Sequence, residues 1–438
     1  MSSNWSAYFE YKTYTYGKTF KYYEYKDKSV TKLPANLPIP PTDTFYLMFR
    51  DCRQLEDISP LANWNISNVK VMSEMFRCCH RLKDISALAN WDVSNVKDME
   101  YMFCYCHKLQ VIAALANWDI SSVKDIGGMF YNCKRLKDIN ALANWDVSKV
   151  ENMRCLFDDC YRLKDITSLS SWDISNVEDM SYIFAGCKRL KDINALANWN
   201  ISNVKYMYFM FAECKRLKDV NALANWSVSN VNTMAYMFQN CHQLKDISAL
   251  SNWNVSNAED ISDMFNGCSQ LEDVSALAKW DVSNVKDMCY MFRECDRLKD
   301  ISALADWDVS NVKDINHMFC SCYQLQNINA LANWNVSKVE NMRNIFEHCH
   351  RLEAVTALAN WDVSTVKNMS KMFRHCYRLK DVTALANWNV SKVENMCYMF
   401  QDCEELEDVT ALVNWDISNL KDVHSMIRHC RQLQVETL

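Results

Sequence analysis

The sequence predicts an α/β repeat solenoid of about 14 turns with about 27 residues in each turn, and three observations lead to this fold class. Fourteen tryptophans recur at the constant interval that separates Trp64 from Trp91, and the last of them is Trp415. Fifteen of the 21 cysteines lie on the same grid, from Cys52 to Cys430. A fixed period in this range is typical of one supersecondary unit that stacks on its own copies.

Each turn is expected to contain a short helix. In the turn that starts at Trp91, four apolar side chains have the spacing of one helical face, namely Met99, Met102, Phe103 and Cys106. Ser94 precedes them at the position of an N-cap residue. In several turns a glutamate follows the serine three residues later, as Glu151 follows Ser148, which is the spacing of a capping box. We therefore expect a helix of about ten residues from Asn95 to about Tyr105.

The rest of each turn is expected to contain a short parallel strand. Residues 82–86 alternate apolar and polar side chains, and we expect this segment to stack in parallel on its copies. The following Ala-Leu-Ala-Asn stretch turns the chain, and residues 91–93 alternate inward and outward. The chain has only five glycines, so Asn and Asp must support the turns. One turn cannot bury its apolar residues alone, and its neighbours must cover them.

The two ends of the chain differ from the repeats. Residues 1–41 hold two tyrosine-rich runs around Gly17 and Lys18, followed by an extended connector with four of the five prolines. We interpret them as a β-hairpin cap on the solenoid of residues 42–438, because a first turn exposes bare core; the alternative is an aromatic docking arm. Residues 431–438 stop inside a strand with no evident cap, so that end could pair with another chain.

Composition excludes several classes of function. The net charge is −6, from 48 basic and 54 acidic residues, which favours neither nucleic acid nor an anionic membrane as a partner. The sequence has no apolar stretch long enough to span a bilayer and no secretory signal, so we expect a cytoplasmic protein. The grid cysteines are then expected to be reduced thiols that form a buried ladder.

The repeat resembles a known family. The matching residues are Val96, Met99, Met102, Phe103, Cys106 and Leu109, and the likeness recurs over about nine-tenths of the chain. The chain is similar to the leucine-rich-repeat variant of BspA-like surface antigens and Mycoplasma-type lipoproteins, which also occurs in amoeba-infecting giant viruses. The resemblance implies a right-handed leucine-rich-repeat solenoid and a role in adhesion or protein binding, and it gives no ground to expect enzymatic activity. Because no lipobox cysteine or wall anchor is present, we expect a member that works in a host cytoplasm or a virion.

Candidate binding residues lie where the repeats differ, because positions that are not needed for stacking can vary and so determine specificity. Two variable columns carry aromatic side chains, which are enriched in the cores of protein interfaces. The first column, on the outer face of the expected helix, holds Tyr101, Tyr182, Phe209, Tyr236, Tyr290 and Tyr398. The second, in the loop before the strand, holds His107, Tyr161, His242, Tyr323, His350 and Tyr377, with His80 as a further member. The alternative is that these rings lie flat and only cover neighbouring turns.

Charged columns on the expected strand offer a second candidate surface. Aspartates such as Asp84 and Asp138 recur in register, and lysines such as Lys83 and Lys137 precede them. We weigh a ligand-binding face against a solvated sheet whose charges offset one another. A calcium ladder is not expected, because the glycine-rich turns of calcium-binding β-rolls are missing.

No catalytic or metal site is expected from the sequence. Cys349 and Cys376 are grid members and should face inward while the adjacent histidines face outward, so a zinc site and a Cys-His nucleophile pair both fail on geometry. We therefore expect no cofactor and a non-enzymatic scaffold that binds an unknown protein partner along one solenoid face. The alternative is a self-associating structural protein, a virion or cell-surface component, that assembles through the C-terminal end or the N-terminal arm.

Overall fold

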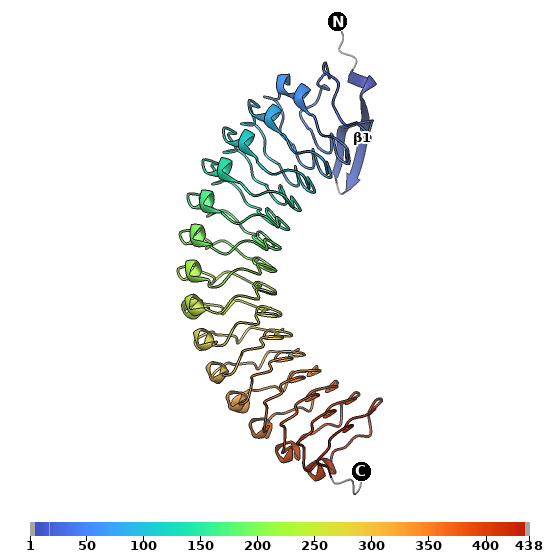
Figure 1. Ribbon diagram of the computed structural model, residues 1–438, viewed down its shortest axis with the longest axis vertical. Helices are drawn as coiled ribbons and strands as arrows, with labels where there is room; N and C mark the ends of the chain where they lie inside the picture. Colours follow the sequence, from blue (N-terminus) through green and yellow to red (C-terminus); the bar gives the residue numbers. More distant parts are fainter. Residues whose placement is uncertain (1–4, 17, 434–438) are drawn as a thin grey trace. The chain divides into compact units, whose positions relative to one another are not determined.

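The computed structural model describes residues 5–16 and 18–433. The chain divides into two compact units, residues 1–215 and 216–438. Each unit is a stack of repeat turns in which equivalent positions recur every 27 residues (Figure 1). The repeat solenoid is therefore confirmed, whereas the domain boundary after residue 41 stays a prediction. Gly17 of the expected hairpin turn and residues 434–438 of the expected C-terminal strand lie outside the described residues.

The N-terminal hairpin is confirmed, and it satisfies the first turn of the stack. It consists of η1 (Trp5–Ala7), β1 (Phe9–Tyr16) and β2 (Lys18–Tyr25), with β1 antiparallel to β2. The Tyr25 amide donates to the Met48 carbonyl at 2.7 Å, and Lys28 Nζ donates to the Arg50 carbonyl at 2.6 Å. In later turns the equivalent carbonyls accept from the turn before. The hairpin thus supplies donors that a preceding turn would otherwise provide, which is the expected role of a cap.

The helical elements of the repeats are short 3-10 turns that run along one side of each stack (Figure 1). In the first unit they are η2 (Ser59–Asn63), η3 (Ser86–Leu88), η4 (Ala113–Leu115), η5 (Asn140–Leu142), η6 (Thr167–Leu169) and η7 (Asn194–Leu196). In the second unit they are η8 (Asn221–Leu223), η9 (Ser248–Asn252), η10 (Ser275–Leu277), η11 (Ser302–Leu304), η12 (Asn329–Asn333), η13 (Thr356–Leu358), η14 (Thr383–Leu385) and η15 (Thr410–Leu412). They occupy the segment that was expected only to turn the chain.

The helix expected from Asn95 to Tyr105 is wrong. Met102 donates its amide to the Met99 carbonyl at 3.2 Å, which closes a β-turn, whereas Tyr101 donates to Gly127 of the next turn at 2.8 Å. Amides at alternate positions thus bond to the neighbouring turn and not to the carbonyl four residues earlier. Apolar spacings of three and four residues fit two consecutive β-turns as well as one helical face, and the cross-turn hydrogen bonds select the former.

The expected serine caps and capping boxes are also wrong. Ser94 donates its amide and its hydroxyl to Asp92 Oδ1 at 3.1 and 2.6 Å, so the serine belongs to an Asx turn. Glu151 reaches Lys124 Nζ at 2.7 Å, one turn away, and not its own Ser148. Asx turns recur at three positions per repeat, and they make the corners of a chain that has very few glycines. Support of the turns by Asn and Asp is therefore confirmed.

The expected parallel strand is reduced to single-residue bridges. On the expected segment, Val111 bridges Asp138 in the first unit and Asp273 bridges Asp300 in the second. A more regular column of parallel bridges lies inside the supposed helix, for example between Asp98 and Asp125. Strand pairing stays this short because an Asx turn follows the bridging residue and redirects the chain.

The core consists of ladders in which each turn bonds to the turn before it. Phenylalanine rings stack at short intervals, for example Phe76 on Phe103 at 5.7 Å between centroids. Trp91 Nε1 donates to the Leu61 carbonyl at 3.0 Å. Cys106 Sγ donates to the Phe76 carbonyl at 3.3 Å. Each of these carbonyls also accepts a backbone amide, so the side chain uses the second lone pair of a buried oxygen. The grid cysteines are buried free thiols, as predicted, except for the half-buried Cys430.

Candidate protein-binding face

The first aromatic column lies at backbone positions that normally favour glycine or asparagine. Each of its six members is the third residue of a β-turn with φ between 53° and 61°, the geometry of a type II turn. The column is therefore not on a helix, as the sequence analysis proposed, but in a turn. A non-glycine residue with positive φ is uncommon and stores strain, and strained positions cluster at functional sites.

Members of the first column are half-buried and stack along the axis of each unit. Tyr182 stacks on Phe209 with centroids 4.6 Å apart. Tyr290 stacks on His317 at 4.3 Å. Arginines cover some of the rings, for example Arg154 over Tyr182 at 5.3 Å. Burial, with the Asp263 carboxylate nearby, raises the pKa of Tyr236. The rings therefore form short stacks that leave part of each ring exposed.

Gly128 shows how the turns make room for this column. It occupies the same position as Tyr101, one turn later, with φ of 57°. A Cβ atom placed on Gly128 would lie 2.1 Å from a carbon of the Tyr101 ring. The ring therefore lies directly over the glycine backbone, and a larger residue there would displace it. Arg77 covers the same ring at 5.6 Å from the centroid.

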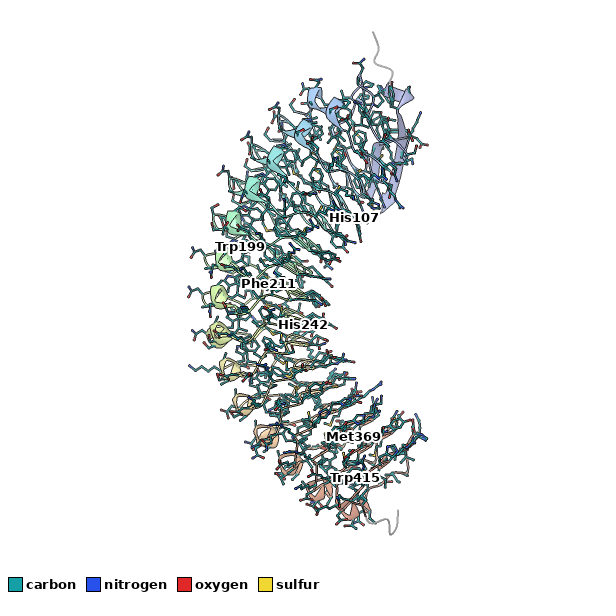
Figure 2. The ribbon with its side chains drawn as sticks, viewed as in Figure 1. His107, Trp199, Phe211, His242, Met369 and Trp415 are labelled. Carbon is teal, nitrogen blue, oxygen red and sulfur yellow. The ribbon has the colours of Figure 1, made fainter. Side chains whose placement is uncertain are left out.

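The second aromatic column is also half-buried and stacked in pairs. Its contacts include His80 with His107 at 4.6 Å, Tyr323 with His350 at 4.8 Å, and His350 with Tyr377 at 4.7 Å. Tyr161 lies between two ammonium groups, and His242 contacts the Gly267 carbonyl at 2.9 Å. Figure 2 places His107 away from the 3-10 turns and Trp199 near them. The rings thus cover neighbouring turns and present their remaining surface on the side away from the 3-10 turns.

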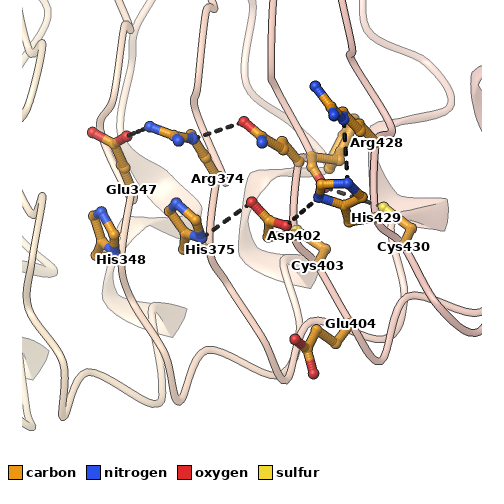
Figure 3. Close-up of polar contacts among 12 residues, drawn as sticks. Glu347, His348, Arg374, His375, Asp402, Cys403, Glu404, Arg428, His429 and Cys430 are labelled. Carbon is orange, nitrogen blue, oxygen red and sulfur yellow. Dashed lines mark hydrogen bonds and ion pairs between the residues drawn. The ribbon is translucent and has the colours of Figure 1, made fainter.

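A polar network that the sequence analysis missed lies beside this column in the second unit (Figure 3). Asp402 bridges two histidines, His375 at 3.3 Å and His429 at 2.9 Å. Arg374 pairs with the buried Glu347 at 3.2 Å. The partners in each of these contacts come from different turns, so the network can be recognised only when equivalent side chains of successive turns are compared. That comparison was possible from the sequence, because the period was known.

Histidines on this face are held neutral by their surroundings. Burial lowers the pKa of His80, His107, His348, His350 and His375, and the neighbouring imidazole or arginine charges act in the same direction. His317 has its pKa lowered to about 4, first by burial and then by Arg293. Neutral rings stack without charge repulsion, which is consistent with the short ring distances.

The cysteines of this region point away from the histidines. Cys349 Sγ donates to the Phe319 carbonyl at 3.2 Å inside the core, whereas His348 and His350 lie at the surface. Burial raises the pKa of the Cys349 thiol well above its usual value, so it is a poor nucleophile. Within residues 5–16 and 18–433, no three His, Cys, Asp or Glu side chains could share a metal ion. In the same part of the chain, none of the helices is long and apolar enough to cross a membrane.

These features define a class: a leucine-rich-repeat-like solenoid with a constant ladder core and a variable aromatic face. The model of one protein family matches residues 43–165, 137–248, 244–354 and 323–437. The chain belongs to this family, which is described as Mycoplasma protein of unknown function, DUF285. Among proteins with curated functions, none matches the chain.

Solved structures with some likeness to this chain are leucine-rich repeat proteins. A leucine rich cell surface protein of Faecalibacterium prausnitzii is 16% identical over 78% of this chain and 93% of its own, with a TM-score of 0.33. A leucine-rich repeat protein of Eubacterium ventriosum is 13% identical over 73% of this chain and 83% of its own, with a TM-score of 0.34. Because both scores are low, we base the class on the family and on the geometry of this chain.

Proposed function

We propose that the chain is a non-enzymatic scaffold that binds a protein partner through its two aromatic columns. The observation that carries the proposal is that both columns stack aromatic side chains on half-exposed positions, and the first column does so at a position where every turn has positive φ. Asparagine or glycine would satisfy this backbone at lower cost. Bulky rings there cost conformational strain, and a partner that covers the remaining ring surface would offset it.

The test uses substitutions that suit the local backbone. Tyr182, Tyr236 and Tyr290 are replaced together by Asn, because Asn tolerates positive φ while it removes the ring. We expect the variant to lose capture of a crosslinked partner from a host-cell lysate while thermal unfolding changes little, since the lost stacking is offset by relieved strain. A control variant, Val111→Asn with Tyr206→Asn, removes two exposed apolar side chains outside the columns. Equal capture by all three proteins would disprove the proposed site.

A cytoplasmic location is also a proposal. It is supported by the ladder of free thiols, in which each S–H group donates to a buried carbonyl of the preceding turn. Such a ladder needs reduced sulfur, and thiols stay reduced mainly in the cytosol. The test is a thiol titration of protein that is isolated without reductant and then denatured. Fewer than 21 free thiols would contradict a cytoplasmic location.

A second candidate function is self-association as a structural protein. The observation that favours it is the turn around η15, where Val413, Ile417 and Val423 are 62%, 52% and 52% exposed. Leu412, Trp415 and Leu420 help to line an apolar cavity of about 510 Å³ there. If this surface joins copies of the chain, light scattering will show a mass that rises with concentration. Replacing Ile417 and Val423 by Asp should then restore the monomer mass; a concentration-independent monomer mass in the parent would exclude this function.

A further inference from the structure

Three consecutive turns of the first unit carry an unusual density of positive charge. Residues 133–139, 160–166 and 187–193 share the pattern Cys-x-Arg-Leu-Lys-Asp-Ile. The basic side chains of these segments are Lys134, Arg135, Lys137, Arg162, Lys164, Lys188, Arg189 and Lys191, and we call them the basic strip. The strip includes the position of the second aromatic column, where Tyr161 stands between Lys134 and Lys188.

The fold holds the basic strip at the surface in a regular array. The leucine and isoleucine of each segment are buried, so the residues between them point outward. Arg162, Lys164, Arg189 and Lys191 are exposed, and the other members are exposed or half-buried. The core rings of the three turns, Phe130, Phe157 and Phe184, are 5.8 and 5.9 Å apart. Equivalent cations therefore recur at about this interval along the unit.

The cations of the strip have no acidic partner among the described residues. Lys134 and Lys188 cover the two sides of Tyr161, with Nζ at 5.8 and 4.4 Å from the ring centroid. None of the eight forms an ion pair, although lysines elsewhere in the same unit do, such as Lys205 with Glu178 at 2.8 Å. Eight like charges on adjacent turns repel one another and leave a strong local positive potential.

Aspartates that follow the lysines do not neutralise the strip. Asp138, Asp165 and Asp192 each accept the amide hydrogen of the residue two positions later, at 3.0, 3.0 and 2.9 Å. For Asp165 these hydrogen bonds, from the Thr167 amide and hydroxyl, lower the pKa of the carboxyl. The three carboxylates keep their negative charge within these Asx turns, but the eight cations outnumber them.

A shallow depression lies within the strip. Lys164, Asp165, Thr167, Lys191 and Asp192 line it, together with Ile166 and Ala195, and its volume is about 280 Å³. Two ammonium groups from successive turns therefore flank a hollow of side-chain size. Asp165 and Asp192 also line the depression, so a ligand carboxylate there would contact the two ammonium groups beside these two carboxylates.

We propose that the basic strip binds an acidic segment of the partner protein, extended along the stack of turns. An extended chain rises about 3.3 Å per residue, so alternate side chains recur about every 6.6 Å. Carboxylates at alternate positions can then follow the cations of successive turns. This inference rests on the proposed protein-binding function and adds the chemistry of the partner.

A polypeptide fits the strip better than a nucleic acid does. Single-stranded nucleic acids bind through aromatic rings on which bases stack. Both faces of Tyr161 are already covered by ammonium groups. A continuous phosphate backbone would also meet one aspartate per turn, whereas an acidic peptide can place neutral residues or amide hydrogens there.

The test measures binding of fluorescent poly-L-glutamate by anisotropy, with single-stranded poly(U) as the competing class of ligand. In the strip variant, Lys164, Arg189 and Lys191 are replaced by Gln. The matched control replaces Arg297, Lys299 and Lys380 by Gln, which are the same positions in the second unit. We expect poly-L-glutamate to bind the parent in a salt-dependent manner, and about tenfold more weakly in the strip variant only.

Three results would overturn the inference: unchanged affinity in the strip variant, an equal loss in the control, or tighter binding of poly(U) than of poly-L-glutamate. Circular dichroism of both variants verifies that these exposed substitutions leave the fold intact. The Asn variant of Tyr182, Tyr236 and Tyr290 should still bind poly-L-glutamate, because its cations are untouched. A failure of the basic strip can therefore be distinguished from a failure of the aromatic face.

Discussion

The two units use the same outward positions in opposite ways. In the first unit the basic strip leaves its cations unpaired. In the second unit Glu272, Glu353 and Glu407 interrupt the lysines of the equivalent column, and Arg297 and Lys299 pair with Glu272 at 3.2 and 3.5 Å. Arg378 likewise pairs with Glu353 at 3.6 Å. The difference shows that the fold does not dictate the charge of these columns, which can differ between turns while the core stays the same.

The inward positions, in contrast, are the same in both units. Trp145 and Trp307 each donate to a leucine carbonyl of the preceding turn at 3.0 Å. Cys160 and Cys322 donate to phenylalanine carbonyls at 3.3 and 3.2 Å. The comparison therefore separates a constant core, which holds the turns together, from a surface that varies between turns.

The largest predicted effect concerns the core. The comparison would fail if the same core substitution lowered the free energy of unfolding by different amounts in the two units. Phe157 and Phe319 are fully buried members of the phenylalanine ladder in the first and second unit. Each Phe→Ala substitution should lower the free energy of unfolding by about 3–5 kcal/mol, because it removes a stacked ring and leaves a cavity. Urea denaturation followed by circular dichroism measures both, and Phe→Leu variants are the milder controls. A large loss at only one site would show that the two cores are not equivalent.

The second prediction sharpens the comparison through pH, because the group with a large pKa shift that it tests is an acid, Asp158, in the first unit and a base, His317, in the second. Burial, then the charge of Asp159, raises the pKa of Asp158 in the first unit to about 8. The pKa of His317 in the second unit is lowered to about 4. The contribution of Asp158 is complete below its unfolded pKa and is lost as pH rises toward 8. The contribution of His317 is complete above its unfolded pKa and is lost as pH falls toward 4.

Substitutions at these two residues should therefore act at opposite ends of the pH range. Asp158→Asn should stabilise the protein by about 1–2 kcal/mol near pH 8 and by little near pH 4, after allowance for solvent screening. His317→Gln should be more favourable, relative to the parent, near pH 4 than near pH 8. Urea denaturation at both pH values measures this. The same pH dependence for both variants would contradict the assignment.

The third prediction transfers the basic strip to the other unit. Replacing Glu272, Gln326 and Glu353 by Lys makes this column of the second unit continuous in lysine from residue 272 to residue 380. We expect poly-L-glutamate to bind about tenfold more tightly than to the parent, since the ion pairs that neutralise the column are removed. A variant with Gln at positions 272 and 353 is the neutral control and should gain less. If the Lys variant binds poly-L-glutamate no more tightly than the parent, positive charge alone does not explain binding to the basic strip.

The sequence predicts the period and the core because they depend on residues that recur, and it predicts the cap because residues 1–41 depart from that repeat. Trp91, Phe103 and Cys106 are buried as expected, since a repeated apolar residue must face its own copies. The predicted helix was wrong because the spacing of apolar residues within one turn does not show that neighbouring turns compete for the same backbone amides. Asp98 Oδ1 accepts a hydrogen bond from the Glu100 amide at 2.9 Å, and the Tyr101 amide donates to the Gly127 carbonyl of the next turn. Either bond removes a donor that a helix needs.

The candidate face was predicted in part. Tyr182 and His350 were selected because they vary from turn to turn, and the structure places them in stacked, half-buried rows. Positive φ at Tyr182 could not be expected, since tyrosine does not favour it. The pairing of Lys124 with Glu151 was missed because Glu151 was assigned a capping role within its own turn. Comparing the charges at equivalent positions of successive turns would have found it.

The ladder hydrogen bonds also determine which insertions and deletions the protein can accept. Every bond from Trp91 or Cys106 to the turn before spans 30 residues, and each bridge joins equivalent positions of adjacent turns. Deleting or duplicating one whole repeat would therefore rejoin each donor with an equivalent acceptor. Recombination between similar repeats can add or remove whole turns without disturbing the core, so the number of turns is itself a heritable variable.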